Sequence, residues 1–122
     1  MARQTLPKVI ACGNFPATLP ITANAADLVM TAADATNKEE FVSSGREIVI
    51  AHNTGVSTRT VTVTSVADGF SKRTGDISAY SLGAGEYAVF GPFERQGWMQ
   101  SDGKIYLEAS HADVKFGIVT IS

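Results

Sequence analysis

Two neighbouring stretches of the chain carry hydrophobic side chains in the manner of β-strands. Residues 47–52 are rich in β-branched side chains, and residues 60–66 alternate hydroxyl residues with valine. A period of two places Val61 and Val63 on one face of a strand and the threonines on the other. The intervening Asn53-Thr54-Gly55 contains residue types that tolerate the backbone of a tight turn. The pattern predicts a β-hairpin over residues 46–66.

The two predicted strands offer different faces. Ile48 and Ile50 alternate with Val49 and Ala51, so the first strand is apolar on both sides. A strand of this kind is expected in the middle of a sheet. The second strand has a threonine face, which can meet water or another subunit.

Three other stretches precede or follow this pair. Residues 27–32 have the composition of a strand, whereas residues 33–44 are polar and predict either a helical turn or a long loop. Residues 77–82 form a weaker strand pattern, which Gly83-Ala84-Gly85 ends. These glycines predict a turn between strands and not a phosphate-binding loop, because no helical pattern follows them.

The next strand, residues 86–90, alternates clearly. Tyr87 and Val89 fall on one face, and Ala88 and Phe90 fall on the other. Pro92 is expected to end this strand, because a proline has no N–H to donate to a continuing ladder.

A second hairpin is predicted around Asp102-Gly103, a dipeptide typical of two-residue hairpin turns. It would pair residues 98–101 with residues 104–107, placing Trp98 opposite Leu107 and Met99 opposite Tyr106. The last strand, residues 114–121, is apolar almost to the C-terminus. Such a strand must pair within a sheet or an interface, because an exposed one would promote aggregation.

Residues 1–25 are expected to form an extended arm. They contain Pro7, Pro16 and Pro20, each of which fixes φ and favours an extended predecessor. The arm has apolar side chains that must be buried somewhere: Leu6, Val9, Ile10, Phe15, Leu19 and Ile21. Two interpretations stay open. The arm lies across its own domain, or it reaches onto a neighbouring subunit.

These patterns give about seven or eight short strands, separated by turns roughly every 8–12 residues. We therefore predict an all-β fold, a single-domain antiparallel β-sandwich or small jelly-roll-like barrel over residues 26–122, preceded by the arm. No linker divides the 122 residues, which suffice for one domain.

Composition narrows the functional classes. The net charge of −2 and the scattered basic residues argue against a nucleic-acid partner. The single Cys12 excludes an intrachain disulfide. Prolines and glycine interrupt the uncharged residues 9–26, so no membrane span is predicted. Two weak signal-like matches, ending at Cys12 and near residues 23–25, lack an adequate apolar region, and we expect an unprocessed, cytoplasmically made protein.

Candidate catalytic groups are sparse. His111 and Asp113 could offer two metal ligands and His52 a third, but nothing in the spacing joins them. A Gly-x-Ser-x-Gly nucleophile elbow is absent from the sequence. Glu39 and Glu40 are adjacent, so they do not face each other as a catalytic pair, and a solvated loop is expected for them. We expect no enzymatic activity, no metal and no cofactor.

Three aromatic residues raise the alternative of a carbohydrate-binding module. Trp98, Tyr106 and Tyr87 could build a sugar platform, but the predicted hairpin places the first two on opposite faces. Packing in a core or an interface is the simpler expectation for them.

The order of several motifs resembles a group of small virion proteins of tailed bacteriophages and prophages. The resemblance covers roughly residues 27–122. Its motifs are Phe41-Val42-Ser43-Ser44-Gly45-Arg46-Glu47 with the strand after it, the Thr-Val alternation, Leu82-Gly83-Ala84-Gly85-Glu86, Val89-Phe90-Gly91-Pro92-Phe93, the Asp-Gly turn and the terminal strand. The resemblance implies a structural protein without an active site.

Within that group, the resemblance favours a head decoration, or cement, protein on the capsid surface of the virion. Such a protein would form a homo-oligomer, with a trimer favoured, and bind the major capsid protein. The candidate interface residues come from the arm and the last strand: Leu6, Phe15, Leu19, Ile21, Phe116 and Ile118. A tail or head–tail junction protein is the alternative within the virion.

Overall fold

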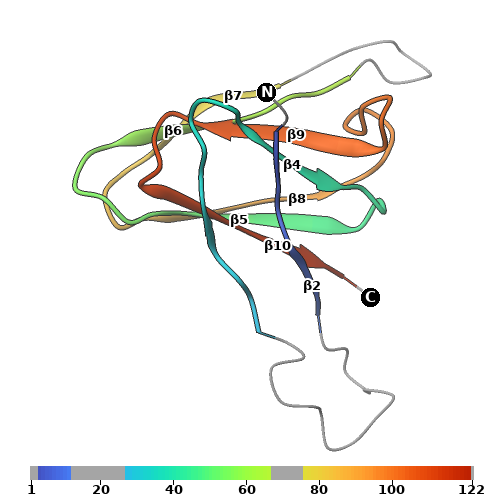
Figure 1. Ribbon diagram of the computed structural model, residues 1–122, viewed down its shortest axis with the longest axis horizontal. Coiled ribbons are helices and arrows are strands. Elements are labelled where there is room, and N and C mark those ends of the chain that lie inside the picture. The colour runs from blue at the N-terminus through green and yellow to red at the C-terminus, as the bar shows by residue number, and fades with distance from the viewer. Residues whose placement is uncertain (1–2, 12–26, 67–75, 122) are drawn as a thin grey trace, which may run out of the picture.

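The computed structural model describes residues 3–11, 27–66 and 76–121, and every regular element in this part of the chain is a β-strand (Figure 1). Two sheets pack face to face, which confirms the all-β, sandwich-like fold. The strands are β1 (Gln4–Thr5), β2 (Lys8–Ile10), β3 (Thr31–Ala32), β4 (Glu39–Val42), β5 (Glu47–Asn53), β6 (Arg59–Val63), β7 (Ile77–Leu82), β8 (Tyr87–Phe93), β9 (Lys104–Ala109) and β10 (Val114–Thr120).

Sheet A has the strand order β1-β4-β9-β6-β7, and sheet B has the order β2-β10-β5-β8, with β3 also paired to β10. Most neighbouring strands are antiparallel. However, β1 runs parallel to β4, and β2 runs parallel to β10. The sheets are therefore mixed and not purely antiparallel as expected, and both parallel pairs involve the N-terminal strands.

The core lies between the two sheets. Along β5 and β9, buried residues alternate with half-buried ones, as expected for strands whose inner faces meet. The largest fully buried apolar side chains are Phe41, Leu82, Ile105, Leu107, Phe116 and Ile118.

The predicted hairpin over residues 46–66 is wrong. β5 pairs with β8 and β10 in sheet B, whereas β6 pairs with β7 and β9 in sheet A. The side chain of Asn53 explains the crossing, because its Nδ2 donates to the carbonyls of Ser57 (2.7 Å) and Leu82 (2.9 Å). The turn residues therefore carry the chain from one sheet to the other. The central position of β5 is confirmed.

The second predicted hairpin is also wrong, although its turn forms. Gly103 has φ +83° and donates to the carbonyl of Gln100, but residues 98–101 are not a strand. β9 pairs instead with β4 and β6. Trp98 packs against Phe93, with ring centroids 4.9 Å apart, so its predicted pairing with Leu107 does not occur.

Two boundaries in the first half of the chain need correction. The strand expected over residues 27–32 shrinks to β3, and the polar stretch 33–44 contains β4. Glu39 and Glu40 lie in β4 and are buried, not in a solvated loop. A turn around Asp34 explains the change: its carboxylate accepts the backbone N–H of Asn37 and so directs the chain into β4.

Pro92 does not end the strand that begins at Tyr87. β8 continues to Phe93 and passes through a cis Gly91–Pro92 peptide. β8 lies at the edge of sheet B, where a proline removes no hydrogen bond from an inner ladder. The register against β5 shifts between Glu47 and Val49, which accommodates the irregular stretch.

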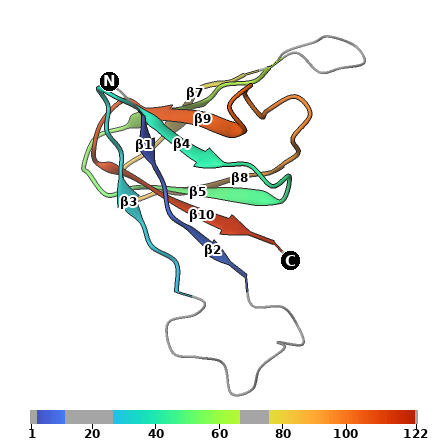
Figure 2. The same ribbon diagram turned by 45° about the vertical axis from the view of Figure 1, so that its right-hand side comes forward.

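The described part of the N-terminal arm lies on its own sandwich (Figure 2). β1 joins sheet A and β2 joins sheet B, with Leu6 between them buried in the core. Residues 12–25 of the predicted arm lie outside the described residues. For residues 3–11, the structure matches the interpretation in which the arm covers its own domain.

Candidate functional site

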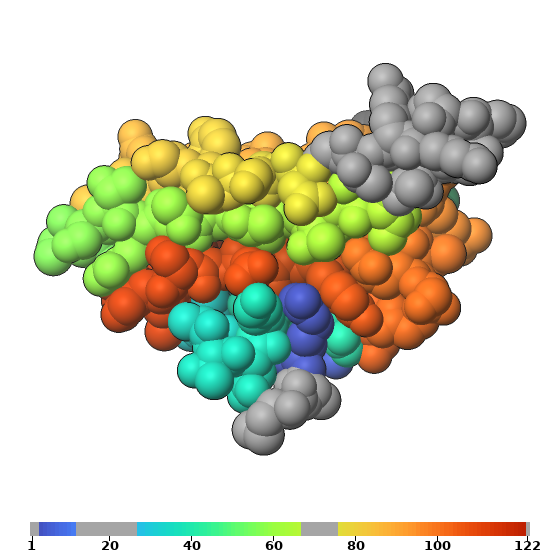
Figure 3. Space-filling model, turned by 90° about the horizontal axis from the view of Figure 1, so that it is seen from above, coloured from blue at the N-terminus to red at the C-terminus, as the bar shows by residue number. Residues whose placement is uncertain are grey.

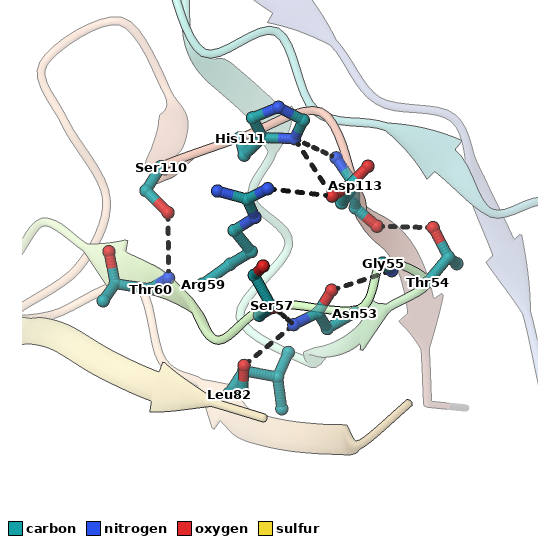
Figure 4. Close-up of polar contacts among 10 residues, drawn as sticks. All are labelled: Asn53, Thr54, Gly55, Ser57, Arg59, Thr60, Leu82, Ser110, His111 and Asp113. Carbon is teal, nitrogen blue, oxygen red and sulfur yellow. Dashed lines mark hydrogen bonds and ion pairs between the residues drawn. The ribbon is translucent and has the colours of Figure 1, made fainter. Parts of the chain in front are cut away.

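A cluster of polar side chains closes one end of the sandwich (Figure 4). It joins the crossover between β5 and β6 to the turn between β9 and β10. The carboxylate of Asp113 lies 3.1 Å from Arg59 and 3.4 Å from Nδ1 of His111, and its carbonyl accepts the hydroxyl of Thr54 at 2.7 Å. A Cβ built at Gly55 would lie 2.2 Å from Oδ2 of Asp113, so a larger residue here would displace the Asp113 side chain.

The contacts of this cluster hold two loops of the domain together. The nearby hydroxyl of Ser110 accepts the backbone N–H of Thr60 at 3.0 Å and so holds the start of β6. Nδ1 of His111 accepts the backbone N–H of Asp113. Because these groups bond to backbone and to each other, the cluster fastens two loops and does not assemble a nucleophile with a base.

The structure does not bring His52 together with His111 and Asp113. His52 lies on the outward side of β5 and stacks on Tyr87, with ring centroids 3.8 Å apart. Within residues 3–11, 27–66 and 76–121, no three His, Cys, Asp or Glu side chains are arranged to hold a metal ion.

Two buried glutamates hold the N-terminal strands. Glu39 receives the backbone N–H of Asp34 on Oε2, and its carbonyl accepts Arg3. Burial raises the pKa of Glu39 to about 7, against hydrogen bonding by Asp34 and the charge of Arg3, and Oε1 has no hydrogen-bond partner. A carboxyl in this environment favours the protonated form.

Glu47 shows the opposite balance. Burial alone would raise the pKa of its carboxyl, but hydrogen bonds from the hydroxyl and N–H of Ser44 and the Lys8 ammonium at 3.1 Å lower it to about 2. Thr120 also donates to Oε2. The carboxylate therefore fixes β2 and β10 as part of a charged, satisfied network.

The outer face of sheet B, which faces away from the core, is largely apolar. Val89 and Tyr87 on β8 are 65% and 66% exposed. On β5 and β10, Ile48, Ile50 and Val119 also point outward and are half-buried. Among the described residues, Leu28 and Met30 lie over Gly117 and cover part of this face on β10.

The outer face of sheet A is polar by comparison. Figure 3 looks onto it, with β7 (yellow), β6 (green) and β9 (orange-red) side by side. Lys104 pairs with Glu40 at 2.7 Å, and Lys38 pairs with Glu108 at 3.2 Å. The sandwich therefore has one solvated face and one face suited to a partner.

The structure relocates the predicted interface residues. Leu6, Phe116 and Ile118 are buried between the two sheets of the same chain, so their side chains are not exposed to a neighbour. They point inward because β10 pairs along its whole length with β5, which leaves its odd-numbered residues outward. Phe15, Leu19 and Ile21 lie outside the described residues.

The three aromatic residues of the alternative sugar platform lie in separate surroundings. Tyr87 stacks on His52 in sheet B, Trp98 packs on Phe93, and Tyr106 on β9 lies beneath the guanidinium of Arg3 at 4.1 Å. Each ring has its own partner, and no shared platform forms among them.

The apolar outer face of sheet B is not among the features predicted from the sequence, although the sequence contains a pattern that indicates it. Residues 47–52 are apolar on both sides, and Tyr87 and Val89 continue this pattern on β8. In a sandwich of two layers, only one side of a sheet meets the core. Apolar residues on both sides of two adjacent strands therefore predict an apolar outer face on their sheet.

Comparisons with protein-family models, with characterised proteins and with solved structures find no match for this chain. Among the described residues there is no helix of the length and hydrophobicity that crossing a membrane requires. The function is therefore inferred from the outer faces of the two sheets and from the charged side chains on them.

Proposed function

We propose that this protein is a structural component of a tailed-phage virion, which binds the outer surface of the head as a homo-oligomer and stabilises the major capsid protein lattice. One observation carries the proposal: the sandwich has a filled core and yet keeps an apolar outer face on sheet B. The resemblance of residues 27–122 to virion proteins adds the biological setting.

The physical requirements of such a role are modest and fit this chain. A cement protein needs apolar surface and a rigid frame, and it needs no catalytic group. Each Å² of apolar surface removed from water contributes about 25 cal/mol before the costs of association. A contact of a few hundred Å² is therefore weak alone, and repetition over a shell strengthens it through avidity.

The proposal is tested by counting the copies of this protein in each particle. Quantitative mass spectrometry of purified particles should find on the order of hundreds of copies per head, as shell-wide avidity requires. The purified protein should also bind heads that lack it and raise their resistance to heat. About a dozen copies or fewer would assign it to the portal or tail instead, and its absence from particles would contradict the proposal.

A further inference from the structure

A buried carboxyl lies beside the first strand of sheet A. Glu39 on β4 is 0% exposed, and its Oε1 has no hydrogen-bond partner among the described residues. Its other oxygen, Oε2, accepts the backbone N–H of Asp34 and lies 3.5 Å from the side-chain amide of Gln4 on β1. One oxygen is bonded and the other is bare, which suits a neutral carboxyl and penalises a charged one.

The charged groups around Glu39 give its carboxylate little compensation. They come from the start of β1, from the turn before β4, from β4 and from β9: Arg3, Asp34, Lys38, Glu40 and Glu108. Asp34 and Glu108 are negative and oppose a further negative charge. Lys38 and Glu40 are already ion-paired, with Glu108 at 3.2 Å and with Lys104 at 2.7 Å. Burial therefore dominates and raises the pKa of Glu39 to about 7.

Arg3 is the remaining cation, and its side chain is engaged elsewhere. Its Nη1 donates to the backbone carbonyls of Glu39 at 3.1 Å and of Leu107 at 3.4 Å. Its guanidinium lies over the ring of Tyr106, 4.1 Å from the centroid. Within residues 3–11, 27–66 and 76–121, no ion pair joins Arg3 to the Glu39 carboxylate. An ionised Glu39 therefore lacks the direct charge partner that Glu47 has in Lys8.

Two segments cover this carboxyl, and β1 is the less firmly held of them. The other is the turn before β4, in which the Asp34 carboxylate accepts the N–H groups of Thr36 and Asn37 and the Asp34 carbonyl accepts that of Lys38. By contrast, β1 pairs with β4 over two residues and ends the described sheet A. Leu6 comes next, is 2% exposed and anchors the chain in the core. Residues 3–5 can therefore lift while the rest of the domain stays folded.

We propose that Glu39 makes β1 a pH-dependent latch: when its carboxyl gives its proton to solvent, residues 3–5 lift away from β4, with Leu6 as the pivot, and water reaches the carboxylate. The protonated carboxyl keeps β1 in place, because it can stay buried without a charge. Lifting replaces the missing partner of Oε1 with water, and it gives up the contacts of Arg3 and Gln4 with β4 and β9. The latch does not depend on the proposed function.

Proton linkage fixes the direction and the size of the effect. The pKa of Glu39 is about 7 with β1 in place and has the ordinary value of 4.5 once water reaches the carboxylate. The closed form is therefore fully favoured below about pH 4.5, and this preference is lost as the pH rises through 7. The equilibrium constant for lifting should increase about tenfold per pH unit between these values, about 300-fold in all, and then level off.

The experiment is amide hydrogen exchange of the full chain, followed residue by residue by NMR from about pH 4.5 to 8. Dividing each rate by that of an unstructured peptide gives the opening constant of that amide. The N–H of Gln4, which donates to the Lys38 carbonyl, reports on β1, and its opening constant should rise by up to about 300-fold in wild-type protein. Glu39→Gln, which cannot ionise, should abolish the rise. Glu40→Gln, the neighbour on the other face of β4, is the matched control and should keep it.

Two further amides show where the opening occurs. The N–H of Lys38 reports on the turn before β4, and that of Asn53, bonded to the Glu86 carbonyl, reports on sheet B. At pH 7 both should open far less often than Gln4. A pH-independent Gln4 in wild-type protein, a rise that persists in Glu39→Gln, or a Lys38 or Asn53 that opens as often as Gln4 would each overturn the latch. Circular dichroism would check that both variants are folded.

Discussion

Glu39 and Glu47 are both fully buried in the same domain, yet they favour different protonation states. The Glu39 carboxyl has an oxygen without a partner, whereas Glu47 receives Ser44, Lys8 and Thr120. Burial disfavours the charge in both cases, so the number of donors decides the outcome. The two residues should therefore give the fold opposite responses to pH.

Glu39→Gln should make the protein more stable at neutral and alkaline pH. The folded pKa of about 7 lies above the ordinary 4.5. The contribution of Glu39 is thus fully present below about pH 4.5 and is lost as the pH rises through 7. At pH 8 the variant should gain about 2–3 kcal/mol in the free energy of unfolding, and at pH 4.5 almost nothing.

Urea unfolding across this pH range measures the difference, with the exposed Glu94→Gln as the control. Equal gains at pH 4.5 and pH 8 would mean that the charge on Glu39 is not responsible.

Glu47→Gln should destabilise the protein at pH 7. The folded pKa of about 2 lies below the ordinary 4.5, so the carboxylate contributes stability above pH 4.5 that is lost as the pH falls toward 2. The loss on substitution should be about 2–3 kcal/mol, and the variant should lack the wild-type decline between those pH values. Ser44→Ala, which removes one donor, should show a smaller loss of the same kind. A Glu47→Gln variant with wild-type acid sensitivity would refute this account.

At the scale of elements, the N-terminal strands join the two sheets. β1 extends sheet A, β2 extends sheet B, and Leu6 enters the core at the point where the chain passes from one to the other. Pro7 follows directly and keeps this passage extended. Residues 3–11 therefore belong to the folding unit, as in the interpretation in which the arm lies across its own domain.

Leu6→Ala should lower the free energy of unfolding by about 2–4 kcal/mol, as expected for a large core side chain cut to alanine. Because Leu6 packs within its own chain, the difference from wild type should not depend on protein concentration. Thermal unfolding at two concentrations about a hundredfold apart checks this, since stability supplied by a partner varies with concentration. A loss that appears only at high concentration would indicate an arm exchanged between subunits.

Strands were predictable from the sequence, but their partners were not. The alternation correctly placed Val61 and Val63 on one face of their strand and separated Tyr87 and Val89 from Ala88 and Phe90, because that pattern depends only on the local period of two. Asn53-Thr54-Gly55 can serve a hairpin or a crossing between sheets. Which of these forms depends on distant groups such as the Leu82 carbonyl, which Asn53 reaches across the core.

The candidate site was harder to predict for a related reason. Leu6, Phe116 and Ile118 are apolar and could serve an interface, but they face the core, and the sequence alone does not show which side of β10 is inward. The buried Glu39 was expected in a solvated loop, since charge normally indicates exposure. Its burial depends on the β1 strand, which arrives from far along the chain.

At the scale of the whole molecule, the difference between the two outer faces predicts how the protein is oriented in an assembly. The ion-paired face of sheet A gains little from leaving water, whereas the outer face of sheet B loses exposed apolar surface in any contact. An assembly should therefore turn sheet B toward a neighbour and sheet A toward solvent. Tyrosines at 87 and 80 report on the difference, because both rings are exposed and only the first lies on the outer face of sheet B.

Hydroxyl-radical footprinting should show this orientation without any mutation. As the protein concentration rises from about 1 to 300 μM, which spans weak micromolar association, oxidation of Tyr87 should fall severalfold. Tyr80, 46% exposed on β7 and packed edge-on against Phe90, should stay equally reactive and serves as the internal control. Tyr87 protected equally at every concentration would mean that its own chain covers the face. Equal protection of both tyrosines on association would mean that the copies meet through another surface.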